Sequence, residues 1–195
     1  MSEIQIRRLE GADLHCHLDG LADVLADCVE GGASVSYMAP FPHSAARTAF
    51  DNFAAEADAG RRVILAAFEA GRPVGTVQLV LSLPPNQPHR GEIAKLLVRR
   101  SARRRGVARA LMAEAEAEAV ARGKTLLVLD TVTGGDAESL YAAMGWSRVG
   151  VIPNYALFPD GRYCDTTVFW KIPGSQPSTT RSARAADDSI PHASS

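Results

Sequence analysis

Apolar residues in the first third of the chain recur at the spacing of an α-helix. In residues 13–29 they follow one another at intervals of three or four, at Leu14, Leu18, Leu21, Leu25 and Val29. This spacing places them on one face of a helix, and the glycines at positions 31 and 32 predict its end. Residues 41–59 repeat the pattern with alanine and phenylalanine and predict a second helix.

The pattern changes at residue 62, where Val, Ile and Leu begin to dominate short runs. Residues 62–68 and 73–83 are two such runs joined by a turn-like tetrapeptide, which is typical of a β-hairpin. Residues 107–122 return to helical spacing, and residues 136–144 predict a short helix with Asp136 as its N-cap. Further short apolar runs predict strands at residues 4–8, 92–98, 125–129, 146–152 and 165–171.

This order of elements predicts the α/β class. The strand, helix and strand across residues 92–130 form a unit whose strands should run parallel, and the preceding hairpin makes the sheet mixed. We expect one twisted sheet of about six or seven strands, with helices on both faces, formed by residues 1–172. Residues 173–195 are rich in Ser, Ala, Pro and charge, so a disordered tail is expected there.

Composition narrows the classes of function. The net charge of −1 provides no global field for nucleic acid or a membrane surface. No run approaches the roughly 20 apolar residues of a membrane span, so a cytoplasmic protein is expected. Three cysteines without a CxxC pair indicate neither a disulfide framework nor a zinc site, and the histidines form no metal-like cluster. We expect Cys16 and Cys28 to be buried in the first helix, and Trp146 and Trp170 in the core.

Candidate chemistry begins at the basic turn between residues 98 and 109. A strand leads here through a turn rich in arginine into the helix of residues 107–122. The first turn of a helix has free backbone N–H groups and a positive dipole, so it attracts an anion, and Gly106 lets a phosphate come close. These residues alone leave three other readings open: a solvated charged loop, a nucleic-acid contact, and a nucleotide site other than a Walker A loop or dinucleotide fingerprint, since neither motif is present.

Two motifs resemble the GNAT superfamily of acetyltransferases. Arg103-x-x-Gly106-x-Ala108 resembles the [QR]-x-x-G-x-[GA] pyrophosphate loop of that family, and the segment from Leu140 to Trp146 resembles its [FL]-Y-x-x-x-G-[FW] segment. The resemblance extends over residues 4–172. Within the superfamily, the tabtoxin-resistance acetyltransferases, which acetylate a small amine-containing toxin, are most similar, at residues 31–38, 92–98, 129–131 and 153–162.

The resemblance implies acetyl-CoA as cosubstrate and a role for particular residues. Tyr141 would be the acid that protonates the departing CoA thiolate. Main-chain groups of three residues would pair with the pantetheine arm as an added strand does: Leu96, Leu97 and Val98. Backbone groups of the turn would hold the CoA pyrophosphate: Arg103, Arg104, Arg105, Gly106, Val107, Ala108 and Arg109. Three further residues would shape the acceptor pocket: Ser34, Tyr37 and Asn154.

Acetyl transfer to an amine also requires a base, because an amine near neutral pH is mostly protonated and cannot attack a thioester. Glu92 at the start of its strand and Asp130 at the end of the neighbouring strand are the candidates, and the resemblance points to both. Either carboxylate could instead bind the ammonium group electrostatically, so the choice of base is open. The N–H of Leu97 or Val98 is the candidate for stabilising the oxyanion.

Together these inferences predict an N-acetyltransferase acting on the amine of a small molecule, such as an amino-acid-like toxin or antibiotic. Direct attack is expected because no cysteine or serine lies in a nucleophile motif. The Pro-rich loop at residues 84–88 and residues 153–162 are expected to close over the site. Two alternatives are a protein or peptide N-acetyltransferase and a catalytically silent CoA-binding module. We expect a monomer or homodimer without a metal ion.

Overall fold

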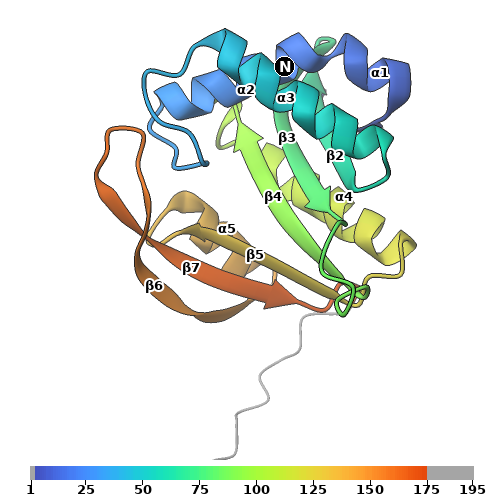
Figure 1. Ribbon diagram of the computed structural model, residues 1–195, viewed down its shortest axis with the longest axis vertical. Coiled ribbons are helices and arrows are strands. Elements are labelled where there is room, and N and C mark those ends of the chain that lie inside the picture. The colour runs from blue at the N-terminus through green and yellow to red at the C-terminus, as the bar shows by residue number, and fades with distance from the viewer. Residues whose placement is uncertain (1–2, 175–195) are drawn as a thin grey trace, which may run out of the picture.

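A computed structural model describes residues 3–174, which form a seven-stranded sheet in the order β1-β2-β3-β4-β5-β7-β6 (Figure 1). Neighbouring strands run antiparallel except β4 and β5, which run parallel. The mixed α/β sheet predicted from the sequence is therefore confirmed. The strands are β1 (Gln5–Leu9), β2 (Arg62–Glu69), β3 (Arg72–Val80), β4 (Arg90–Val98), β5 (Leu126–Val132), β6 (Ser147–Leu157) and β7 (Tyr163–Lys171).

Helices cover both faces of this sheet. The alternating residues of β2 show the two faces, because Ile64 packs with α2 and α3 whereas Val63 and Leu65 pack with α4 and α5. A 3₁₀ turn (Arg100–Ala102) follows β4 and leads toward α4. The helices are α1 (Gly11–Cys16), α2 (Leu18–Glu30), α3 (His43–Asp58), α4 (Val107–Ala121) and α5 (Asp136–Ala143).

Apart from shifts of one or two residues at helix ends, two features of the helices differ from the sequence prediction. The helix predicted over residues 13–29 is two helices that meet at His17, whose φ of −108° and ψ of 2° leave the helical region. The His17 ring packs edge-on against Phe68, with ring centroids 4.8 Å apart. The apolar stripe continues across the break within one buried cluster, so the spacing of apolar residues did not indicate the break. The N-cap of α5 is Gly135 and not Asp136, whose carboxylate accepts a hydrogen bond from Arg104 at 3.3 Å.

The predicted burial of cysteines and tryptophans is half correct. Cys28 and Trp146 are buried as expected. Cys16 is exposed, because it ends α1 outside the buried face of that short helix. Trp170 is 39% exposed, because it lies on β7, beyond the strands that α2 and α3 cover (Figure 1). Its neighbour Phe169 points to the opposite face and belongs to the core beside α4.

β4 and β5 are paired only over their first residues. Their register ends at Glu92 and Val128, whereas β4 stays paired with β3 up to Val98 and β5 with β7 up to Val132. The two strands therefore diverge toward their carboxyl ends, as Figure 1 shows. The edge of β4 that faces β5 keeps main-chain groups without a strand partner. Ligands of open α/β sheets bind at such carboxyl ends.

The chain beyond β7 is described for only a few residues. The tail expected at residues 173–195 lies, from residue 175 onward, outside the described residues. Within residues 3–174, no helix has both the length and the apolar character that crossing a membrane requires.

Candidate active site

The turn before α4 has a row of free backbone N–H groups. Gly106 caps the helix with φ of 81° and ψ of −2°, a left-handed conformation that glycine adopts without strain. The first helical hydrogen bond runs from the Ala110 N–H to the Gly106 carbonyl at 3.0 Å. The N–H groups of residues 104–109 have no acceptor among the described residues. This turn therefore offers the donors and the dipole that bind an anion.

A cavity of about 380 Å³ opens at this turn and extends along β4. It includes every residue predicted to hold the cosubstrate except Arg105: Leu96, Leu97, Val98, Arg103, Arg104, Gly106, Val107, Ala108 and Arg109. The unpaired edge of β4 and the free N–H groups of the turn thus belong to one continuous wall. The structure brings these two predicted parts together.

The arginines of the turn divide into two sets. Arg103, Arg104 and Arg109 line the cavity. Arg105 instead forms an ion pair with Glu69 at 2.6 Å, and its hydrogen bond lowers the pKa of the Glu69 carboxyl. Arg105 is thus the one residue predicted to hold the cosubstrate that lies outside the cavity, and it ties the turn to the end of β2.

Arg100 ties the turn to α2. Its backbone N–H and its Nε donate to the two carboxylate oxygens of Asp27 at 2.8 and 2.9 Å, and its Nη2 donates to Glu30 at 2.7 Å. Burial alone would raise the pKa of Asp27, but these hydrogen bonds outweigh it and lower that pKa. A merely solvated charged loop would not need such anchors, so the contacts favour a turn held in one conformation for binding.

A second cavity of about 740 Å³ adjoins the first and shares six lining residues with it: Ala33, Val35, Leu96, Arg103, Asp136 and Ala137. It occupies the opening between β4 and β5. Five of the six residues predicted to be catalytic or to shape the acceptor pocket line it: Glu92, Asp130, Tyr141, Ser34 and Tyr37. The sixth, Asn154, is not among the lining residues, and its N–H donates to a carboxylate oxygen of Asp165 at 2.8 Å.

Tyr141 is held rigidly in the wall of this second cavity. Its ring packs against Trp146 and Phe169, with ring centroids 6.0 and 5.9 Å apart. Burial, and secondarily the negative charge of Asp130, raise the pKa of Tyr141. The hydroxyl group makes no hydrogen bond to another described residue. Tyr141 is therefore a neutral phenol near pH 7.

The two carboxylates have different surroundings. Glu92 lies in the last residue pair between β4 and β5, and Arg90 Nη1 lies 3.7 Å from its Oε2. Asp130 lies two residues beyond that pairing, and its carboxylate makes no hydrogen bond or ion pair with a described residue. Its charge acts electrostatically on both Tyr141 and Lys95. Asp130 is thus the freer of the two groups to interact with an acceptor.

A cover over the second cavity is formed by residues 31–42 and the β6–β7 hairpin. The Ser34 hydroxyl donates to the Leu157 carbonyl at 2.7 Å, and the Ala39 N–H donates to the Pro159 carbonyl at 3.0 Å. The expectation for residues 153–162 is met in part, because residues 155–158 line the cavity. The loop at residues 84–88 does not line it, because this loop precedes β4 and so lies at the strand end opposite the cavity.

Three other lining residues were not predicted as site residues: Lys95, Tyr155 and Thr166. Lys95 lies inside a segment interpreted as a regular strand, Tyr155 lies within residues 153–162 but was given no role of its own, and Thr166 lies on β7 without a motif around it. The positions of Tyr155 and Thr166 follow only from the pairing of β5, β7 and β6.

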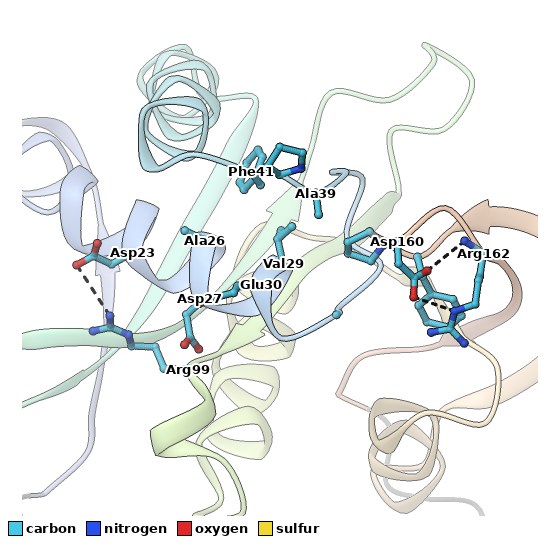
Figure 2. A pocket seen from close by; sticks show the side chains of 14 residues that line it. Asp23, Ala26, Asp27, Val29, Glu30, Ala39, Phe41, Arg99, Asp160 and Arg162 are labelled. Carbon is cyan, nitrogen blue, oxygen red and sulfur yellow. Dashed lines mark hydrogen bonds and ion pairs between the residues drawn. The ribbon is translucent and has the colours of Figure 1, made fainter.

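A third cavity, of about 700 Å³, lies between α2 and the tip of the β6–β7 hairpin (Figure 2). Its charged side chains already have partners, as the dashed lines between Asp160 and Arg162 and between Asp23 and Arg99 show. None of the predicted catalytic residues lines it. We therefore place the candidate site in the first two cavities. Residues 3–174 contain no group of three or more His, Cys, Asp or Glu side chains that could hold a metal ion.

Comparison with known families agrees with this geometry. Residues 31–146 match the model of the acetyltransferase (GNAT) family. The chain belongs to this family. It is therefore an acetyl-CoA-dependent acetyltransferase, and the matched segment contains the turn at Gly106, both carboxylates and Tyr141.

Solved structures share the GNAT fold at low sequence identity. An N-acetyltransferase from Staphylococcus aureus Mu50 superposes with a TM-score of 0.73 at 20% identity, covering 88% of this chain and 99% of that one. The yncA acetyltransferase from Salmonella typhimurium, solved with acetyl-CoA, superposes with a TM-score of 0.73 at 16% identity, covering 91% of this chain and 99% of that one. A ribosomal-protein-alanine N-acetyltransferase from Brucella melitensis superposes with a TM-score of 0.69 at 24% identity, covering 86% of this chain and 99% of that one. At these identities the comparison shows the fold alone.

Replacing Gly106 with alanine should weaken acetyl-CoA binding to this GNAT enzyme about 10- to 100-fold, the effect of losing one charge-assisted hydrogen bond. A Cβ at Gly106 meets no protein atom within 4 Å, so the methyl group fits the protein itself. The methyl group would, however, clash with a phosphate bound close to the backbone. Titration calorimetry with acetyl-CoA measures the effect. Gly60→Ala is the matched control, because Gly60 has φ of +70° and equally open surroundings but lies away from the cavities. Equal losses of affinity in both variants would show that backbone strain alone is responsible.

Proposed function

We propose that this chain transfers an acetyl group from acetyl-CoA to the amine of a small molecule by direct attack on the thioester. One observation carries the proposal: Glu92, Asp130 and Tyr141 line a single cavity that is continuous with the anion-binding turn at Gly106. When bound, acetyl-CoA would supply the acetyl group as an activated thioester. We also propose residues 1–172 as the catalytic domain.

The residues of the first cavity fit the CoA molecule. The free N–H groups of residues 104–109 and the side chains of Arg103 and Arg109 suit a pyrophosphate. The unpaired main chain of Leu96, Leu97 and Val98 suits the amide groups of the pantetheine arm.

In the proposed reaction, Asp130 or Glu92 accepts the proton of the acceptor's ammonium group, and Tyr141 donates a proton to the departing thiolate. Direct attack is supported by the state of Cys28, the cysteine that lines the first cavity. Burial raises the pKa of the Cys28 thiol, which makes it a poor nucleophile. The N–H of Leu97 or Val98 is our candidate for stabilising the oxyanion.

We place the acceptor among small amines of the kind acetylated by the tabtoxin-resistance acetyltransferases, with a role in resistance as one consequence. The cover supports this proposal, because residues 32–38 and the β6–β7 hairpin both line the second cavity and the two segments are joined by hydrogen bonds. Residues 31–38 and 153–162, two of the segments that resemble this subgroup, belong to the cover. An acetyltransferase of proteins would need an open groove for a peptide chain, so that alternative is less favoured.

The first experiment measures CoA release from acetyl-CoA by the purified full chain, with amino acids, dipeptides, simple amines and a peptide pool as acceptors. We expect turnover with at least one small amine and none with peptides. Turnover with peptides alone would favour a protein acetyltransferase. Tight acetyl-CoA binding without any turnover would favour a silent CoA-binding module.

A further inference from the structure

β4 carries a bulge that changes the direction of its side chains. Residues four apart on a regular strand lie on the same face, yet Ile93 packs beside α4 and Leu97 packs beside α2 and α3. The register with β3 shifts at this point, where Val77 lies opposite two residues of β4. Lys95 is one of the two and adopts φ of 52°, unusual for a residue with a side chain. Bulges commonly redirect a side chain next to an active site.

The bulge places Lys95, which is half-buried, in the wall of the second cavity. Nζ donates to the Ser36 hydroxyl at 2.9 Å and lies 5.8 Å from the centre of the Tyr37 ring. Both partners are neutral. No carboxylate among the described residues lies within ion-pair distance of Lys95.

The charge of Lys95 is therefore incompletely compensated. Burial, and then the positive charge of Arg62, lower the pKa of Lys95, while Asp130 partly opposes them. Arg62 itself is already paired with Glu56. A charge that is partly withdrawn from water is stabilised by an opposite charge, so an ammonium group that lines a cavity and lacks an ion-pair partner points to an anionic ligand.

We propose that Lys95 binds a carboxylate of the acceptor, so that this enzyme prefers amines that also carry a carboxylate group. This inference rests on the proposed function. Asp130 and Glu92 would receive the ammonium group of such a molecule, and Lys95 would receive its carboxylate on the same cavity wall. Lys95 then determines specificity and takes no part in the transfer of protons.

The test compares amino acids and small dipeptides with their carboxamides, which keep the size but lose the negative charge and one acceptor oxygen. CoA release gives kcat and KM for each pair. We expect the free acids to exceed their amides in kcat/KM by roughly 10- to 100-fold, the range for a hydrogen bond between charged groups. The difference should lie in KM more than in kcat.

Variants then assign the difference to Lys95. Lys95→Met should abolish the preference for acids and leave acetyl-CoA affinity unchanged, whereas Lys95→Arg should retain much of it. Lys124→Met is the control, because Lys124 donates to the Pro88 carbonyl away from the cavity. If Lys95 only fixes residues 33–38 through Ser36, Lys95→Met will slow acids and amides equally and the inference is wrong.

The outcomes separate this inference from the proposed function. Turnover of amides as fast as acids by the wild-type enzyme overturns the role of Lys95 and leaves the small-molecule function intact; this comparison needs no variant. No turnover of any acid, amide or amine overturns the small-molecule function, and the inference fails with it.

Discussion

Tyr141→Phe should lower kcat about 10²- to 10⁴-fold, the usual contribution of a positioned general acid. The change removes only the hydroxyl group, so the packing against Trp146 and Phe169 remains. Affinity for acetyl-CoA should stay within a few-fold, because Tyr141 lines the second cavity and not the one at Gly106. Steady-state kinetics of CoA release together with calorimetry of acetyl-CoA binding measure both quantities.

The control for this prediction is Tyr163→Phe, since Tyr163 is 71% exposed and lines neither cavity. Tyr141 is protonated at neutral pH, because burial keeps its pKa above the ordinary value of about 10. The wild-type enzyme should therefore show no loss of activity from tyrosine ionisation below about pH 10, the ordinary value for this side chain. A Tyr141→Phe enzyme as active as wild type would exclude the hydroxyl group as the acid and would point to water as the proton donor.

The anion-binding turn could be predicted from the sequence because its physics is local. A strand, a glycine and a helix start are adjacent in the chain, and their N–H groups are free wherever the helix begins at Gly106. The roles of individual arginines could not be predicted in this way. Whether an arginine faces the cavity, as Arg103 does, or pairs with Glu69, as Arg105 does, depends on β2 and α2, which are distant in sequence.

The acceptor cavity depends on non-local features that hydrophobic patterns do not contain. Asp130 and Tyr141 were found through chemistry and a motif, but Lys95 was missed because one extra residue in β4 reverses the alternation. The cover was only partly predicted because it joins segments that are distant in sequence. Residues 31–42 reach the cavity through hydrogen bonds to a hairpin more than 100 residues later, as the separation of Ser34 and Leu157 by 123 positions shows.

Asp130→Asn should lower kcat about 10²- to 10⁴-fold, as expected for loss of a general base, and more than Glu92→Gln does. The reason is their surroundings: Arg90 lies 3.7 Å from the Glu92 carboxylate, whereas Asp130 has no ion-pair partner among the described residues. Glu92→Gln should act mainly on the KM of the acceptor, by about the tenfold or less of a partly exposed ionic contact. Steady-state kinetics with one small amine, identified in the panel of acceptors, compare the two variants.

The pH dependence of these variants separates a base from a purely electrostatic partner. Without a base, only the free amine reacts, and its fraction rises about tenfold per pH unit below the pKa of the amine. If Asp130 is the base, Asp130→Asn should regain activity as the pH rises, while Asp160→Asn, on the exposed hairpin tip outside both cavities, should follow the wild type. A constant ratio of Asp130→Asn to wild type across the pH range would instead show that Asp130 binds the ammonium group. A larger loss in Glu92→Gln, recovered at high pH, would make Glu92 the base and leave Asp130 to orient the amine between Tyr141 and Lys95.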